Sequence, residues 1–269
     1  MRYILLQDWF DVPAGTPVSA AMGDLQCSVK STLEDVDHDA VVNVSTSAQI
    51  AFVKPEGFQP SHSLPGEPRT PIEFFPYFEV SARRDWVHPS DGFSFKIESQ
   101  QDDVSVLQGR YIAVAASLNG GNALAAFVRM VQLWCVELGC SVPQEKIWST
   151  ALAAGMKETE VPSLLTLPLI FGERHCPHQK GSVSNINQGN VSLGQVTRSV
   201  CRGVVTNLAS MMTPDMLRQG GVRRIVGSGA CLIRNPVLQR EIEEQYRTKV
   251  EFVEEGNACI GAAMVIADR

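Results

Sequence analysis

The strongest constraint on the fold is the regular alternation of strand-like and helix-like segments near the end of the chain. A β-branched run over 222–230 ends in a glycine turn, and 235–247 begins with Asn and then Pro, which is typical of a helix start. A second strand-like run, 249–253, precedes a helix over 257–268 whose small residues would allow it to pack closely on a sheet. This alternation predicts an α/β layer architecture.

The earlier part of the chain carries further elements of both kinds. A hairpin is predicted over 40–53 because β-branched and apolar residues flank a polar tip, Ser45-Thr46-Ser47. Helical periodicity covers 123–139, 143–155 and 192–212, the last with Ser192 as a candidate N-cap. The other expected segments are a strand and a short helix within 11–30, an edge segment at 73–78, strands at 111–118 and 164–174, a proline-rich loop at 54–71 and a surface insertion at 79–110.

Composition and charge exclude several classes of function. The net charge of −6 provides no global basic field for nucleic acid or anionic lipid, so an anionic ligand must be held locally. Seven cysteines without a C-x-x-C pair favour a reducing compartment. The opening residues do not form a signal segment, and no apolar run reaches the length of a membrane span. We therefore expect a soluble, cytoplasmic protein without nucleic-acid or membrane partners.

Two short polar segments are candidates for binding phosphate or a nucleotide. Gly227-Ser228-Gly229-Ala230 lies between a strand and a helix, where glycine lets a ligand approach the backbone. It matches neither a Walker A loop nor a full G-x-G-x-x-G, and for these residues taken alone a tight strand-to-helix turn is the simpler interpretation. The hydroxyls and amides of Ser45-Thr46-Ser47 could donate to phosphate oxygens, although a simple polar hairpin turn would have the same sequence.

Other residues admit chemical interpretations that compete with structural ones. Asp24 could accept a proton from a substrate hydroxyl, or it could cap the following helix. The run 174–178, with Cys176 and His178, could suggest a metal site or a thiol nucleophile, but a solvated loop with a Glu173–Arg174 ion pair is the simpler interpretation. The Met and aromatic residues of 127–134 are expected in a helix core.

Taken in order, the motifs resemble a known family. The chain reads G-T-P-V, G-D-x-Q, the S-T-S hairpin, F-G-E-R, G-S-G-A, R-N-P-x-L and G-A-A. This order is similar to that of the C-terminal half of FGGY carbohydrate kinases, over roughly residues 9–78 and 111–269. The joint order of the motifs is specific to that family, although each motif alone is weak.

The resemblance implies a lobe of the actin-like ATPase fold, with a ribonuclease-H-like mixed sheet and helices on both faces. It implies transfer of a phosphoryl group from ATP, with Mg²⁺, to a terminal hydroxyl of a ketose, with sedoheptulose as the first expectation. Asp24 matches the catalytic carboxylate that contacts the sugar and accepts its proton. Gly261-Ala262 matches small-residue packing near the hinge. The residues matching the ATP site are Thr46, Ser47, Gly121, Gly227, Ser228, Gly229 and Asn235.

The chain also departs from the family pattern. The N-terminal lobe, whose D-x-G-T loop holds the metal, has no counterpart here, so no metal ligand is assigned to this chain. Residues 1–8 are an unmatched extension, 9–269 form the C-terminal nucleotide-binding lobe, and 79–110 interrupt it. We expect a truncated form with little activity alone, because a cleft with one wall missing cannot exclude water. The alternatives are a non-catalytic binding or regulatory fragment, or a kinase for xylulose, ribulose or glycerol.

Overall fold

A computed structural model gives the structure of the chain. It describes residues 2–4, 8, 10–15, 17–19, 22–60, 70–78, 110–254 and 257–267. The predicted insertion at 79–110 lies outside the described residues apart from Arg110, and so does much of the proline-rich loop that was predicted before it.

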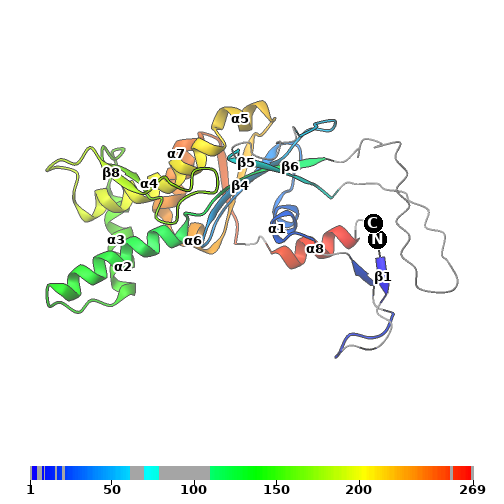
Figure 1. Cartoon of the computed structure of the whole chain (residues 1–269), viewed down its shortest axis with the longest axis horizontal. Coiled ribbons are helices and arrows are strands. Elements are labelled where there is room, and N and C mark those ends of the chain that lie inside the picture. Colours follow the sequence, from blue (N-terminus) through cyan, green and yellow to red (C-terminus); the bar gives the residue numbers. More distant parts are fainter. Residues whose placement is uncertain are drawn as a thin grey trace.

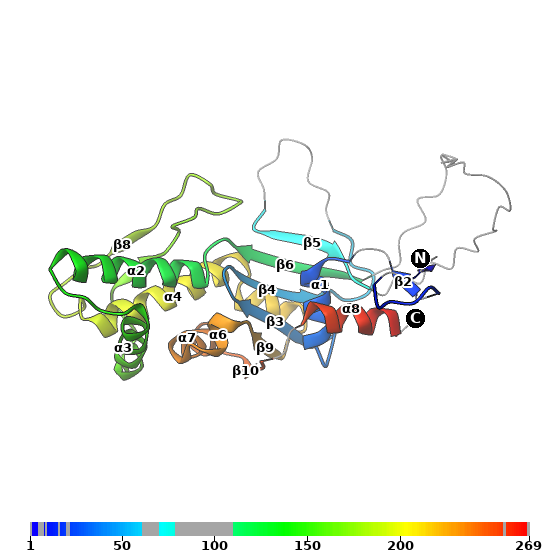
Figure 2. The same cartoon turned by 90° about the horizontal axis from the view of Figure 1, so that it is seen from below.

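Six strands form one mixed sheet, in the order β10-β9-β3-β4-β6-β5 (Figure 2). The pairs β10–β9 and β9–β3 are parallel, while β3–β4, β4–β6 and β6–β5 are antiparallel. The predicted hairpin is confirmed as β3 and β4, and the predicted edge segment is the edge strand β5. The strands are β1 (Arg2–Ile4), β2 (Pro17–Ser19), β3 (Asp39–Val44), β4 (Ala48–Val53), β5 (Ile72–Pro76), β6 (Tyr111–Ser117), β7 (Leu165–Leu167), β8 (Ser182–Ser184), β9 (Arg224–Ser228) and β10 (Lys249–Phe252).

The helices follow the sequence signals closely where capping residues are clear. Ser192 accepts a hydrogen bond from the Gln195 N–H and caps α4, and Asn235 caps α7 in the same way through the Leu238 N–H. Two short helices, α5 and α6, have no counterpart in the sequence prediction. The helices are α1 (Asp24–Thr32), α2 (Gly121–Glu137), α3 (Gln144–Lys157), α4 (Leu193–Met211), α5 (Pro214–Gln219), α6 (Ala230–Ile233), α7 (Pro236–Tyr246) and α8 (Ala258–Ala267).

The two faces of the sheet bury different helices. Successive side chains of a strand point to opposite faces, so Val42 and Val44 of β3 join a core with α2, α4 and α7, whereas Val41 packs towards Val29 of α1. Figure 1 shows α1 and α8 on one side of the sheet and the larger group of helices beyond its other end. The expected mixed sheet with helices on both faces is confirmed.

The last helix packs closely on another helix. The structure shows α8 in extensive contact with helix α1, rather than lying directly on the sheet. A Cβ atom on Gly261 would lie 1.8 Å from the carbonyl oxygen of Cys27, so only glycine permits this approach. The small residues expected at 261–262 therefore serve close packing between two helices.

Two predictions are wrong. The strand expected over 164–174 is limited to β7, which pairs only with β8, because Pro168 follows at once and cannot donate to a ladder. The apolar residues at 127–134 are only partly core: Phe127 is buried, but Leu133 and Trp134 are more than half exposed. The buried residues of α2 lie in its first half, and its last turns extend beyond this packed part and are exposed.

Candidate functional site

Three segments far apart in the sequence meet at the tip of the β3–β4 hairpin. The backbone N–H of Gly121 donates to the carbonyl of Ser45 at 2.8 Å, and the N–H of Asn122 donates to the carbonyl of Thr46 at 3.0 Å. These two amides open α2 and would otherwise lack partners inside the helix. The hairpin tip is therefore fixed to the start of α2 by its backbone, which leaves the Thr46 side chain exposed.

Glycine is required at this junction because the backbones lie in contact. A Cβ on Gly120 would lie 2.3 Å from the carbonyl carbon of Ser47, and one on Gly121 would lie 2.3 Å from the carbonyl oxygen of Ser45. Gly229 has a positive φ of 99°, and its Cβ would lie 2.6 Å from the carbonyl oxygen of Val44. The predicted phosphate loop, Gly121 and the glycine turn after β9 thus form one packed unit.

A cleft of about 730 Å³ opens at this junction. It receives residues from the hairpin tip, from the start of α2, from the turn after β9 and from the start of α7, and α3 adds Trp148 and Leu152. Of the residues predicted from sequence, Thr46, Gly121 and Asn235 line it. The full lining is Ser45, Thr46, Gly121, Asn122, Ala125, Trp148, Leu152, Ala230, Cys231, Arg234 and Asn235.

The other predicted nucleotide residues lie just behind the lining. Ser228 is buried and its hydroxyl accepts a hydrogen bond from Asn43 at 3.1 Å. Gly227 packs against the Phe252 ring, which a Cβ would approach to 2.6 Å. Gly229 supports the hairpin as described, and Ser47 contacts Gly120 through its backbone. In this structure these four residues shape the cleft and do not line it.

Asp24 lies apart from the cleft lining. It is the first residue of α1, on the opposite face of the sheet from the core that contains α2, and its carboxylate is exposed. The N-cap position belongs to Gly23, so the alternative that Asp24 caps the helix is wrong; its Oδ1 accepts from the Leu25 N–H at 2.7 Å. The structure leaves this carboxylate open to solvent, and its catalytic role stays a prediction.

The buried carboxylate of Glu173 was missed by the sequence interpretation. The expected pair with Arg174 is not present among the described ion pairs. Instead Glu173 accepts from Ser117 at 2.5 Å, from Asn119 at 2.9 Å and from Asn207 at 2.8 Å. These bonds tie the loop after β7 to the end of β6 and to α4, so Glu173 organises the scaffold behind α2.

Thiol and metal chemistry find little support in the described part of the chain. The Cys176 thiol donates to Gln179 at 3.2 Å. Burial raises the pKa of the cleft thiol Cys231 to about 11, so it stays protonated near neutral pH. Across the described ranges, no group of three or more His, Cys, Asp or Glu side chains is placed to hold a metal ion. No described helix combines the length and hydrophobicity needed to cross a bilayer.

Comparison with solved structures defines the class of fold. Xylulose kinase from Rhodospirillum rubrum superposes with a TM-score of 0.65 and 16% identity, over 95% of this chain and 43% of its own. Glycerol kinase from Plasmodium falciparum, solved with ADP, superposes with a TM-score of 0.56 and 12% identity, over 96% of this chain and 44% of its own. The fold is therefore the actin-like ATPase fold of sugar kinases, as the motifs led us to expect.

Sequence comparison narrows the similarity further. Human sedoheptulokinase is 38% identical over 261 residues, which is 97% of this chain and 48% of the human protein. The resemblance to FGGY carbohydrate kinases is thereby confirmed, and the chain is a homologue of sedoheptulokinase over nearly its whole length. It spans about half the length of the curated relatives that it matches. No protein-family model matches the chain.

Proposed function

We propose that this chain supplies the nucleotide-binding lobe of an ATP-dependent carbohydrate kinase that transfers the γ-phosphoryl group to a terminal hydroxyl of sedoheptulose. Residues 9–269 would form that lobe. The observation that carries the proposal is the single cleft at the hairpin tip, because it gathers Thr46, Gly121 and Asn235 from three distant segments. The identity with sedoheptulokinase, rather than the geometry, supports this particular sugar.

The lining of the cleft suits a nucleotide. Trp148, Leu152 and Ala125 offer an apolar wall against which an adenine ring can stack. Thr46 and Arg234 provide a hydroxyl donor and a cation for phosphate oxygens, which the net acidic chain cannot hold by its global field. The volume of about 730 Å³ falls in the range of small-molecule sites. We therefore add Trp148, Leu152 and Arg234 to the ATP-site residues inferred from sequence.

Phosphoryl transfer needs a base and charge neutralisation in addition to nucleotide binding. Asp24 is proposed as the base from its match to the family motif, and its carboxylate is exposed to solvent. Mg²⁺ is proposed to bind together with the ATP phosphates, because phosphate oxygens are ligands that it prefers. Mg²⁺ would neutralise charge on those phosphates.

Two other functions would use the same fold. A non-catalytic binding or regulatory lobe would keep the cleft and not need Asp24, and a kinase for xylulose, ribulose or glycerol would keep both. The xylulose and glycerol kinases share only the fold at 12–16% identity, so sedoheptulose is favoured over these sugars. Measured turnover distinguishes the two: a kinase lobe supports phosphoryl transfer, and a regulatory lobe does not.

The test joins this chain to the half of human sedoheptulokinase that it does not match and measures sedoheptulose-dependent release of ADP. We expect turnover by the chimera and little turnover by the chain alone, because transition-state stabilisation needs groups on both sides of a closed site. Asp24→Asn should abolish turnover and retain ATP binding, whereas Asp215→Asn, on the surface of α5, should change neither. Full turnover by the Asp24→Asn chimera would remove Asp24 from the base role, and preference for another sugar would overturn the substrate.

A further inference from the structure

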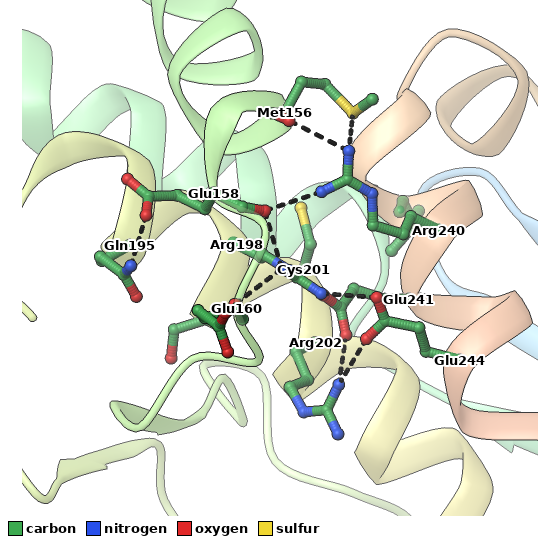
Figure 3. Close-up of polar contacts among 12 residues, drawn as sticks. Met156, Glu158, Glu160, Gln195, Arg198, Cys201, Arg202, Arg240, Glu241 and Glu244 are labelled. Carbon is green, nitrogen blue, oxygen red and sulfur yellow. Dashed lines mark hydrogen bonds and ion pairs between the residues drawn. The ribbon is translucent and has the colours of Figure 1, made fainter.

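Helix α3 forms one wall of the cleft, and two arginines from other helices bind its last turn. Arg240 donates to the carbonyl of Met156 at 3.0 Å and to that of Glu158 at 2.8 Å. Arg198 donates to the carbonyl of Glu158 at 2.8 Å and to that of Glu160 at 2.7 Å. Figure 3 shows both guanidinium groups converging on this backbone. Cations at a helix C-terminus satisfy carbonyls that have no partner within the helix.

Carboxylates of α7 form ion pairs with two arginines of α4, Arg198 and Arg202. Arg198 is fully buried and is bound by Glu241 at 2.6 Å and Glu244 at 2.6 Å (Figure 3). Arg202 reaches Glu241 from the next turn of α4 at 2.7 Å. These contacts join the end of α3 to α4 and α7 in one hydrogen-bonded network. Such a network holds its members in one geometry because each unpaired buried charge would be costly.

The N-cap of helix α7 also reaches the cleft. Asn235, which caps α7, lines the cleft, and Arg240 lies five residues later in the helix. Between them Val237 packs on Gly155 of α3, where a Cβ would approach its methyl group to 3.2 Å. Arg240 therefore connects the wall that carries Asn235 to the helix that carries Trp148.

We propose that Arg240 is a positioning residue for the nucleoside part of the nucleotide, acting through α3. The inference rests on the proposed function, since it assigns Trp148 and Leu152 to the nucleoside. The phosphate side is fixed independently, because Thr46 and Gly121 are held by backbone bonds between the hairpin and α2. Loss of the Arg240 bonds leaves the Met156 carbonyl without its arginine and the Glu158 carbonyl with Arg198 alone, which loosens the end of α3 and shifts Trp148 without moving the hairpin tip.

The test compares two ligands on the full chain by calorimetry: ATP, and inorganic tripolyphosphate, which lacks a nucleoside. Arg240→Met retains an unbranched side chain but has no guanidinium group, so both hydrogen bonds to the carbonyls are lost. It should weaken ATP binding about tenfold, which corresponds to about 1.4 kcal/mol, and leave tripolyphosphate binding unchanged. Arg240→Lys keeps a cation at the end of α3 and should lose less ATP affinity than Arg240→Met.

Arg224→Met is the matched control. Arg224 is partly buried like Arg240. It is paired with the carboxylates of Asp39, Glu34 and Glu251 and lies at the start of β9, away from the cleft. Its loss should lower the melting temperature without changing the ratio of the two affinities. Equal weakening of both ligands by Arg240→Met, or the same ATP loss in Arg224→Met, would show a merely structural role and overturn the inference. Wild-type chain that binds neither ligand would instead overturn the proposed function together with the inference.

Discussion

The amide of Gln49 is the clearest case of a polar group at odds with its surroundings. Its Oε1 atom is buried in the sheet and has no hydrogen-bond partner in the described structure. Gln49 shares a row across the strands with Asn43, which does donate to Ser228. A buried oxygen without a partner costs free energy, and an apolar side chain of similar shape does not.

Gln49→Leu is therefore expected to leave the free energy of unfolding unchanged or raise it by up to about 1 kcal/mol. Asn43→Val provides the contrast. It removes the hydrogen-bond donor to the buried Ser228 hydroxyl and should lower the free energy of unfolding by about 1–3 kcal/mol. Urea denaturation of both variants measures the two free energies. A clear loss of stability in Gln49→Leu would mean that the amide has a stabilising partner.

Gly121→Ala tests the contact between the hairpin and α2. The added methyl group would fall 2.3 Å from the Ser45 carbonyl oxygen and 3.0 Å from the Cys231 sulfur. We expect a loss of about 1–3 kcal/mol, typical of overpacking, and weaker ATP binding. Gly189→Ala, on an exposed loop where a methyl meets only an ordinary contact, should change neither. Thermal unfolding with and without ATP provides the readout, and normal ATP stabilisation of Gly121→Ala would contradict the role of the junction.

Some of the residues that the sequence assigned to the ATP site line the cleft, and others have a structural role instead. Thr46, Gly121 and Asn235 line the cleft as the motif match led us to expect. Ser228 is engaged with Asn43 instead, because the alternation of β9 turns its side chain away from the cleft face. Trp148 carried no local signal, since a tryptophan on an amphipathic helix is expected in the core. Arg234 belongs to the R-N-P-x-L motif but was not assigned to the site.

Capping residues decide where the helices beside the cleft begin. Asn235 has two tasks: it caps α7 by accepting from the Leu238 N–H at 3.0 Å, and it lines the cleft. Thr213 caps α5 by the same kind of bond, from the Met216 N–H at 3.2 Å, outside the cleft. Comparing the two residues therefore distinguishes the loss of stability from a missing helix cap from any additional loss of ATP binding.

Asn235→Ala and Thr213→Ala should each lower the free energy of unfolding by about 1 kcal/mol. Only Asn235→Ala should also weaken ATP binding, because the start of α7 then frays into the cleft. Denaturation and ATP titration of the pair measure both effects. Equal ATP affinity in the two variants would place the nucleotide elsewhere.

Elements were predictable where the local signal and the tertiary contacts agree. The caps of α4 and α7, the β3–β4 hairpin and the strand β6 follow directly from sequence. The contact of α8 with α1 was not predictable because a stripe of small residues fits a helix as well as a sheet. The exposed end of α2 was mispredicted because periodicity shows which face is apolar, and not whether a neighbour extends far enough to cover it.

On the scale of the whole molecule, the cleft depends on long-range contacts that no local pattern contains. The hairpin at 45–47 meets Gly121 and Gly229, and the arginine network joins α3, α4 and α7. The order of motifs led us to expect the ATP site only through the family resemblance. The ion pairs behind it were not predicted, because pairs such as Arg198–Glu241 are 43 residues apart.

Hydrogen–deuterium exchange of the full chain, with and without saturating ATP, tests the nucleotide cleft most directly. Slower exchange with ATP is predicted at the hairpin tip 45–47, at Gly121 and Asn122, and across 230–235. Unchanged exchange at all three segments, or protection confined to the separate groove lined by Lys146, Lys157 and Ser192, would contradict the assignment of this cleft to the nucleotide.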